Sequence, residues 1–150
     1  MKITDLVQVD SIDASFETSS KKQLFQKLAG YVSKYYNIEE TSIFDALLER
    51  ERLGATGIGG GVAIPHGKIA GIGKPYGFFA KLKAPIDFES TDDKPVDLVF
   101  LLLAPEDAGA DHLKALACIS KILRNTAAIK KIRAAASARE IMDIMVEADN

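Results

Sequence analysis

Two histidines and one arginine are the side chains in this 150-residue sequence whose types and surroundings indicate chemistry. His66 follows a glycine-dense segment and stands between a proline and a glycine in the run IPHG. Glycine lets other groups approach the backbone closely and proline fixes φ, which predicts a segment that holds one imidazole at a defined, exposed position. The unperturbed pKa of histidine is about 6.5, so much of it is a neutral nucleophile at neutral pH. We therefore predict that His66 carries the chemistry.

His112 and Arg50 are the candidate partners of His66. His112 directly follows Asp111, a residue type that caps helices, so we expect it in a first helical turn, where free backbone N–H groups favour an anion. Arg50 stays charged and can bind phosphate oxygens through two N–H groups. Considered alone, His112 would be interpreted as a solvated first-turn residue. Arg50 alone would be interpreted as a surface arginine paired with Glu49 or Glu51 of the same helix. Taken together, two histidines and an arginine predict a site for one phosphoryl group.

Several other known site motifs do not match this sequence. The glycine segment follows a helix rather than a strand, which excludes a dinucleotide fingerprint, and five residues rather than four separate Gly61 from Gly67, which excludes a Walker loop. No ligand set at zinc spacing is present, so we predict no metal. Cys118 falls among apolar residues and is expected in the core. Thr56, inside the glycine segment, could donate its hydroxyl to an anion or could only shape a turn.

Composition and charge restrict the classes of protein that fit. A formal net charge of −2 argues against a nucleic-acid partner, since nucleic-acid binders carry a basic surplus. No apolar run reaches the length of a bilayer crossing, and the N-terminus lacks the apolar region of a secretory signal. The single cysteine excludes an internal disulfide and fits a reducing compartment. We expect a cytoplasmic protein with one domain over residues 1–150 and no membrane insertion.

Apolar residues at helical spacing, together with capping residues, predict five helices. Ser20 and Ser137 open capping boxes, Asn37 has cap spacing for the second helix, and Gly54 is its expected stop. We predict helices over roughly 20–36, 38–52, 112–124, 125–133 and 137–147.

The strand pattern predicts the fold class. A short strand is expected at 12–16 and another at 77–83, and the continuously apolar run at 96–103 is typical of a central strand covered on both faces. The connections between strands are long enough to contain helices. This favours an α/β layered domain with a mixed sheet.

A long signature surrounds His66. It consists of an acid, six residues, an apolar residue, a glycine, two residues and then apolar-Ala-apolar-Pro-His-Gly, and here the acid is Glu51, the apolar–glycine pair is Ile58-Gly59 and the last block is VAIPHG. On this motif, and on the block PVDLVFLLLAPEDAGADHLKALACISKIL, the chain resembles the fructose/mannitol-type enzyme IIA domains of the bacterial phosphoenolpyruvate-dependent phosphotransferase system, above all their nitrogen-regulatory branch. The resemblance extends over nearly the whole chain. It departs at Ala55, where many relatives have serine, and at Gly60, where many have asparagine.

The resemblance implies a fold and a set of site residues. The implied fold is a mixed, mainly five-stranded sheet flanked by helices. His66 becomes the phosphoryl acceptor, reacting through Nε2, with His112 as the second histidine and Arg50 as the arginine of the active site. Thr56 and Gly67 are the expected phosphate-binding positions. The resemblance implies no cofactor and no metal.

The resemblance also implies partners. The phosphoryl donor would be an HPr-like carrier with a phosphohistidine, and regulatory targets would include potassium-transport components and sensor kinases. The protein would be a component of the phosphotransferase system that regulates nitrogen, potassium and carbon metabolism, rather than an autonomous small-molecule enzyme. Two alternatives stay open: a sugar-specific (fructose or mannitol) enzyme IIA that passes phosphate to a IIB domain, and a binding module in which His66 is not phosphorylated. Apolar residues exposed at the rim of the site would support docking of the carrier.

Overall fold

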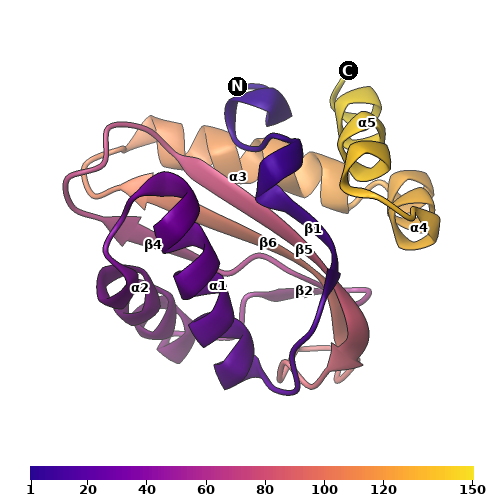
Figure 1. Cartoon of the computed structure of the whole chain (residues 1–150), viewed down its shortest axis with the longest axis horizontal. Helices are drawn as coiled ribbons and strands as arrows, with labels where there is room; N and C mark the ends of the chain where they lie inside the picture. Colours follow the sequence, from indigo (N-terminus) through magenta and orange to yellow (C-terminus); the bar gives the residue numbers. More distant parts are fainter.

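A strand buried on both faces forms the centre of the fold in the computed structural model, which describes residues 1–150 (Figure 1). This strand, β6, pairs with β5 in antiparallel fashion and with β3 and β4 in parallel. The sheet has the order β1-β5-β6-β3-β2, and β4 pairs with β6 off this path. The predicted mixed sheet flanked by helices is confirmed, with β4 as a sixth strand. The strands are β1 (Ile12–Phe16), β2 (Gly57–Gly59), β3 (Val62–Ala63), β4 (His66–Ile69), β5 (Tyr76–Ile86) and β6 (Val96–Pro105).

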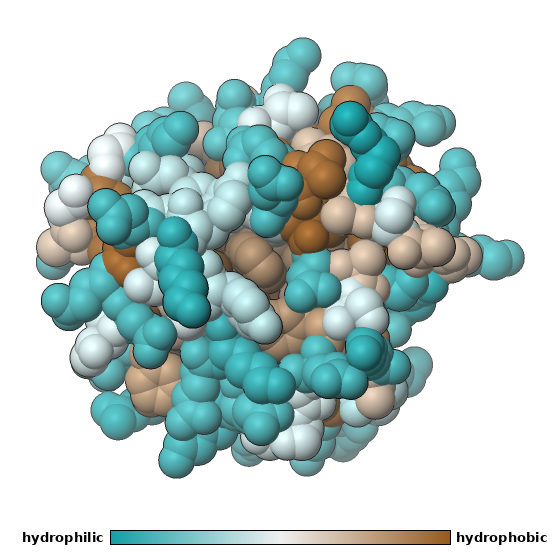
Figure 2. All heavy atoms as spheres, viewed as in Figure 1, coloured by the Kyte–Doolittle hydropathy of each residue, from teal (hydrophilic) through white to brown (hydrophobic).

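Alternate side chains of β6 enter two different apolar clusters, because successive residues of a strand point to opposite faces. Leu98, Phe100 and Leu102 belong to one cluster and Val99, Leu101 and Leu103 to the other. The face of the molecule seen in Figure 2 is mostly hydrophilic, with apolar patches among the polar side chains. Most of the larger apolar side chains pack inside, in one cluster on each face of the sheet.

Five helices cover the sheet, and none of them combines the length and the apolar character that a bilayer crossing needs. Helices α1 and α2 lie against one face and α3 and α5 against the other (Figure 1). Two short 3₁₀ turns, Ile3–Asp5 and Val9–Ser11, precede β1. The helices are α1 (Lys21–Tyr36), α2 (Glu40–Arg52), α3 (Ala110–Leu123), α4 (Thr126–Ala134) and α5 (Ala138–Asp149).

Two helix boundaries differ from the prediction. Asn37 does not open α2; it ends α1 in the left-handed conformation with φ 56°, which asparagine tolerates better than most residues. Asp111 does not cap α3, because the helix already begins at Ala110, after Gly109 with φ 53°. A glycine at positive φ turns the chain into the helix two residues earlier than expected. His112 therefore still lies in the first turn, as predicted.

The glycine segment forms a hairpin that the sequence pattern did not predict. Strands β2 and β3 pair in antiparallel fashion around Gly60 and Gly61, whose φ values are +66° and +80°. Two turn residues at positive φ match the twist of paired strands. Strands of two or three residues are too short to show an alternating pattern.

Helix α2 packs directly on β4 at Gly67. A Cβ atom added to Gly67 would lie 2.9 Å from the Cβ of Ala46 and 3.1 Å from its carbonyl carbon. Residues four apart lie on the same face of a helix, so this contact also brings Arg50 to the start of β4, where His66 lies. Because Gly67 has no side chain, α2 can lie close to β4, and this close packing sets the distance between Arg50 and His66.

We expect the Gly67→Ala variant to be destabilised by roughly 1–3 kcal/mol, the usual cost of an extra methyl group in a closely packed interior. Urea unfolding measures the change. The control is Gly73→Ala, where an added Cβ would meet nothing within 4 Å, and where we expect a change within about 0.5 kcal/mol. Equal unfolding midpoints for the two variants would contradict the close packing of α2 on β4.

Candidate active site

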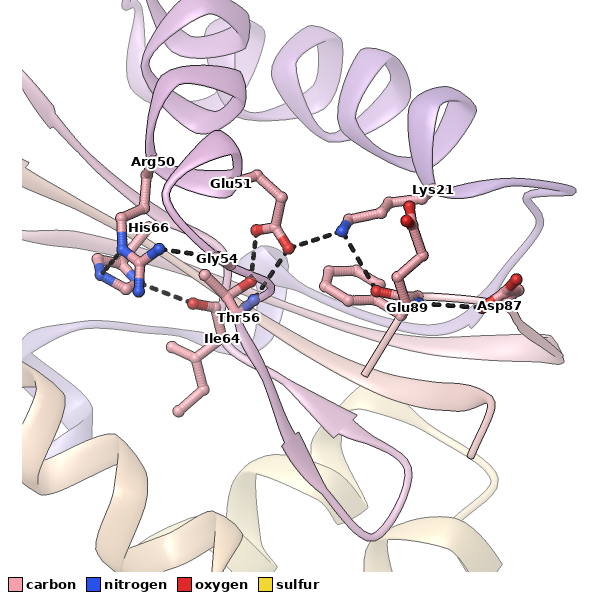
Figure 3. A network of polar contacts seen from close by, with 10 residues as sticks. Lys21, Arg50, Glu51, Gly54, Thr56, Ile64, His66, Asp87 and Glu89 are labelled. Atoms are coloured by element: carbon pink, nitrogen blue, oxygen red, sulfur yellow. Dashed lines mark hydrogen bonds and ion pairs between the residues drawn. The ribbon is translucent and has the colours of Figure 1, made fainter. Parts of the chain in front are cut away.

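His66, Arg50 and His112 meet at one place, although they come from three different elements. The Nε of Arg50, in the last turn of α2, donates a hydrogen bond of 3.2 Å to Nε2 of His66, the first residue of β4 (Figure 3). The rings of His66 and His112 have their centroids 5.6 Å apart. His66 is paired with Leu102 near the C-terminal end of β6, and α3 begins shortly after that strand. The cluster predicted from sequence is therefore present.

The hydrogen bonds of His66 define one tautomer. Its Nδ1 lies 2.8 Å from the carbonyl oxygen of Ile64, which can only accept, so Nδ1 carries the proton. Nε2 then carries the lone pair of the ring, and this lone pair accepts the hydrogen bond from Arg50. Burial lowers the pKa of His66 and the Arg50 charge lowers it further, against the opposing effects of the Ile64 carbonyl and the Glu51 charge. The result is a neutral imidazole with a nucleophilic Nε2.

Arg50 has no carboxylate partner. Its neighbours on α2 are engaged elsewhere: Glu49 with Arg52 at 3.4 Å and Glu51 with Lys21 at 2.8 Å. Instead, Nη1 of Arg50 donates to the carbonyl oxygen of Gly54 at 2.9 Å. A guanidinium held by neutral acceptors keeps its full charge for an anion. The alternative of an arginine paired with an acid of its own helix is not what the structure contains.

His112 adds a second imidazole in a positive environment. Burial lowers its pKa, and the charges of His66 and Lys68 lower it further. Its Nδ1 is buried and has no hydrogen-bond partner. Such buried polar atoms are uncommon in proteins and need an explanation. The ring stands at the N-terminal end of α3, where the helix dipole favours negative charge.

Thr56 and Gly67 lie beside this cluster, and each of them already contacts another part of the chain. Thr56 is 5% exposed, and its hydroxyl and its backbone N–H both donate to the carboxylate of Glu51, at 2.8 Å and 2.9 Å. This geometry fits the turn-shaping alternative for Thr56. Gly67 is buried under α2. That either residue binds phosphate stays a prediction.

Sequence reasoning missed the partners of Glu51. The signature contains this acid, but Lys21 lies thirty positions earlier and no local pattern links the two. It also did not identify the apolar rim, which we define as Leu53 and Leu113. These two leucines are 81% and 68% exposed, and in the sequence they directly neighbour Gly54 and His112. Their exposure became visible only once the burial of each residue was known.

The arrangement suits attack on an anionic group. A neutral nitrogen nucleophile lies beside an unpaired guanidinium, a second imidazole and the N-terminal end of a helix. Positioned donors of this kind are what transfer of a phosphoryl group requires, since its charge spreads over three oxygens. No group of three or more His, Cys, Asp or Glu side chains is placed to hold a metal ion.

Comparison with known sequences gives consistent matches. The model of the family described as phosphoenolpyruvate-dependent sugar phosphotransferase system, EIIA 2, matches residues 5–148. The nitrogen regulatory protein of Bradyrhizobium diazoefficiens is 52% identical over 145 residues, which cover 97% of this chain and 95% of that protein. The fructose-specific EIIABC component of Bacillus subtilis is 34% identical over 150 residues, covering 99% of this chain but 24% of that protein.

Comparison with solved structures gives matches to proteins of the same kind. The nitrogen regulatory protein IIA-Ntr from Neisseria meningitidis superposes with a TM-score of 0.90 at 34% identity, over 95% of this chain and 98% of that one. The mannitol IIA of Escherichia coli gives a TM-score of 0.78 at 19% identity, over 93% of this chain and 98% of the other. At that identity the second match supports the fold alone.

We expect His66 to titrate below its ordinary pKa of 6.5, because burial and the Arg50 charge disfavour the protonated ring. An NMR titration of the ring nitrogens measures this pKa, and Arg50→Gln should raise it by removing the repelling charge. Since the native state binds this proton more weakly than the unfolded chain, the contribution to stability is complete above pH 6.5. It is lost as the pH falls through the native pKa.

The matched control for this titration is Arg52→Gln, an exposed arginine of the same helix that pairs with Glu49. It should leave the pKa of His66 unchanged. A pKa that moves equally in both variants, or that falls in Arg50→Gln, would show that Arg50 does not set the charge state of His66.

Proposed function

The chain belongs to the EIIA type 2 family of the phosphoenolpyruvate-dependent phosphotransferase system, and on that premise we propose that it is a phosphoryl carrier whose acceptor atom is Nε2 of His66. The observation that carries the proposal is the tautomer of this ring. Nδ1 donates to the Ile64 carbonyl, which leaves the lone pair of Nε2 directed at the guanidinium of Arg50. A nucleophile and a phosphoryl-binding cation are thereby prepared side by side.

The donor in this proposal is an HPr-like carrier that bears a phosphohistidine. Nε2 of His66 attacks the phosphorus in line, and the new Nε2–P bond forms as the P–N bond of the carrier breaks. The electron pair of that bond returns to the ring nitrogen of the carrier. No proton has to move at His66, because Nδ1–H keeps its hydrogen bond to the Ile64 carbonyl throughout. The lowered pKa keeps the attacking ring neutral at neutral pH.

Arg50 and His112 stabilise the transferred group in this scheme. Arg50 donates to Nε2 in the unphosphorylated protein, so it releases the lone pair as the phosphoryl group arrives and then donates to the phosphoryl oxygens. The buried Nδ1 of His112 has no competing partner within the chain. The first-turn N–H groups of α3 add a favourable dipole. Thr56 and Gly67 remain proposed contributors to phosphate binding.

The apolar rim supports docking of a protein donor. Leu53 and Leu113 are more exposed than the other large apolar side chains of the chain, and they flank Arg50 and His112 in sequence. Exposed leucines around a polar centre are typical of a surface that another protein covers. The carrier would bury these leucines while presenting its phosphohistidine to His66.

We propose a regulatory rather than a purely metabolic role. The relative with 52% identity is called a nitrogen regulatory protein, as is the Neisseria structure. Phosphorylation would add about two negative charges at a face that carries Arg50 and Lys68. A change of sign at the docking face would alter which target proteins bind, with potassium-transport components and sensor kinases as the proposed class of targets.

A sugar-specific role is the second candidate, and the fructose-specific relative with 34% identity favours it. The two roles share the chemistry at His66 but differ in the fate of the phosphoryl group. Rapid transfer from the phosphorylated protein to a fructose or mannitol IIB domain would identify the sugar-specific role. A phosphorylated form that persists in the presence of such IIB domains supports the regulator.

The central prediction concerns phosphorylation. Wild-type protein mixed with phosphoenolpyruvate, enzyme I and an HPr-like carrier should gain one acid-labile phosphoryl group by intact mass. His66→Ala should gain none, because it lacks the nucleophile. His112→Ala should still be phosphorylated, at a reduced rate. A wild-type protein that accepts no phosphate from any carrier would falsify the proposal and leave the binding-module alternative.

The apolar rim generates a separate prediction. The double variant Leu53→Ser and Leu113→Ser should raise the KM for the phosphorylated carrier roughly tenfold, a loss of about 1.4 kcal/mol of binding. Its maximal rate should stay close to that of the wild type, because neither leucine touches the reacting atoms. Unfolding midpoints establish that the variant is folded. An unchanged KM would place the docking surface elsewhere.

A further inference from the structure

Glu51 is an almost completely buried acid whose carboxylate forms no hydrogen bond to the His66 ring or to the Arg50 guanidinium. Its side chain is 8% exposed, and its carboxylate accepts from three donors. The backbone N–H and hydroxyl of Thr56 donate at 2.9 Å and 2.8 Å, and Nζ of Lys21 lies at 2.8 Å. A buried carboxylate needs compensating donors of this kind, because its desolvation is costly. These contacts are drawn in Figure 3.

One branch of contacts leads from Glu51 to Arg50. The carboxylate of Glu51 anchors Thr56 at the far end of the short loop after α2. At the near end, the backbone N–H of Gly54 donates to the backbone carbonyl of Glu51 at 3.1 Å, so both ends of the loop are fixed. The carbonyl of Gly54 in that loop accepts from Nη1 of Arg50 at 2.9 Å. The loop therefore orients the guanidinium, and its Nε–H points at His66.

A second branch leads from Glu51 to His66. The carbonyl of Thr56 accepts from the backbone N–H of Ile64 at 3.0 Å. The carbonyl of Ile64 in turn lies 2.8 Å from Nδ1 of His66, the bond that selects the tautomer. Thr56 is thus held on one side by Glu51 and holds on its other side the residue that orients the nucleophile. Both branches start at the same carboxylate.

We propose that Glu51 is a positioning residue for the phosphoryl transfer. It acts through Thr56 to hold the Nδ1–H tautomer of His66 and the orientation of Arg50. The proposal rests on the proposed function for its effect on rate, but the effect on the tautomer does not depend on it. Lys21 extends the network to α1, because its Nζ pairs with Glu51 and also donates to the carbonyl of Phe88 at 3.2 Å.

The contacts of Glu51 favour a positioning role over a direct effect of its charge on His66. Among the causes that act on the pKa of His66, the charge of Glu51 comes last, after burial, the Ile64 hydrogen bond and Arg50. The hydrogen bonds of Glu51 go to Thr56 and Lys21. A glutamine at position 51 can accept from the N–H of Thr56 and donate to its hydroxyl, so it preserves the anchor while removing the charge. An alanine removes both.

The experiment compares Glu51→Ala, Glu51→Gln and Glu49→Ala by two readouts. Glu49 is the matched control, an exposed acid of the same helix that pairs with Arg52. NMR of the unphosphorylated protein reports the tautomer of His66 from its ring-nitrogen shifts, and the intact-mass assay reports the rate of phosphorylation. The tautomer matters because a ring protonated on Nε2 has no lone pair there to attack phosphorus.

We expect Glu51→Ala to populate the Nε2–H tautomer and to lose roughly 10- to 100-fold in rate, the size of effect that misplacing a reactive group by about 1 Å produces. Glu51→Gln should restore the Nδ1–H tautomer and most of the rate, and Glu49→Ala should match the wild type in both. A Glu51→Ala protein with an unchanged tautomer overturns the proposal. So does a Glu51→Gln protein as impaired as Glu51→Ala, which would assign the effect to charge.

Thr56 provides a second test if Glu51→Ala does not fold. Thr56→Val removes the hydroxyl that donates to Glu51, and Thr56→Ser keeps it. We expect a larger fraction of the Nε2–H tautomer in the valine variant than in the serine variant, and equal fractions would overturn the proposal. Because the tautomer is measured without phosphate, a wild-type protein that fails to accept phosphate rejects the proposed function while the role of Glu51 is still decided.

Discussion

The burial of β6 on both faces is the constraint on which the rest of the structure depends. Its side chains enter two separate apolar clusters, so helices have to cover the sheet on both sides. A polar site inside such a sandwich is disfavoured, because each buried polar group would need a partner there. The candidate site residues His66, Arg50 and His112 lie instead at the end of the strand. There α2, β4 and the start of α3 converge on His66.

In the proposed phosphoryl transfer, the site resolves a conflict between charge and nucleophilicity. A phosphoryl group needs nearby cations, but the nucleophile has to stay unprotonated to attack it. Arg50 serves both requirements, since its charge lowers the pKa of His66 and its N–H groups suit phosphoryl oxygens. The Ile64 carbonyl holds the proton on Nδ1, away from the attacking atom. His112 and the end of α3 extend the positive region without adding a fixed charge beside Nε2.

Side chains behind the reactive groups hold this geometry in place. The backbone of Thr56 links Glu51 on one side to Ile64 on the other, so a single buried carboxylate connects the C-terminal turn of α2 to the segment that leads into β4 and His66. Lys21 joins the same carboxylate to α1. Gly67 adds a steric constraint, because its lack of a side chain allows α2 to lie directly on β4. Hydrogen bonds and packing together fix the distance between Arg50 and His66.

The sequence by itself determined the periodic elements and the candidate site residues, because both leave local signals. Apolar spacing identified the five helices and the central strand, and the motif around His66 identified the family. Tertiary structure alone decided what depends on contacts between distant segments or on local φ. The glycine hairpin is too short to show a strand period, and positive φ at Gly109 rather than a cap at Asp111 sets the start of α3. The pairing of Lys21 with Glu51, the tautomer of His66 and the exposure of Leu53 and Leu113 arise only when the chain has folded, since each joins or uncovers groups that are not neighbours in sequence.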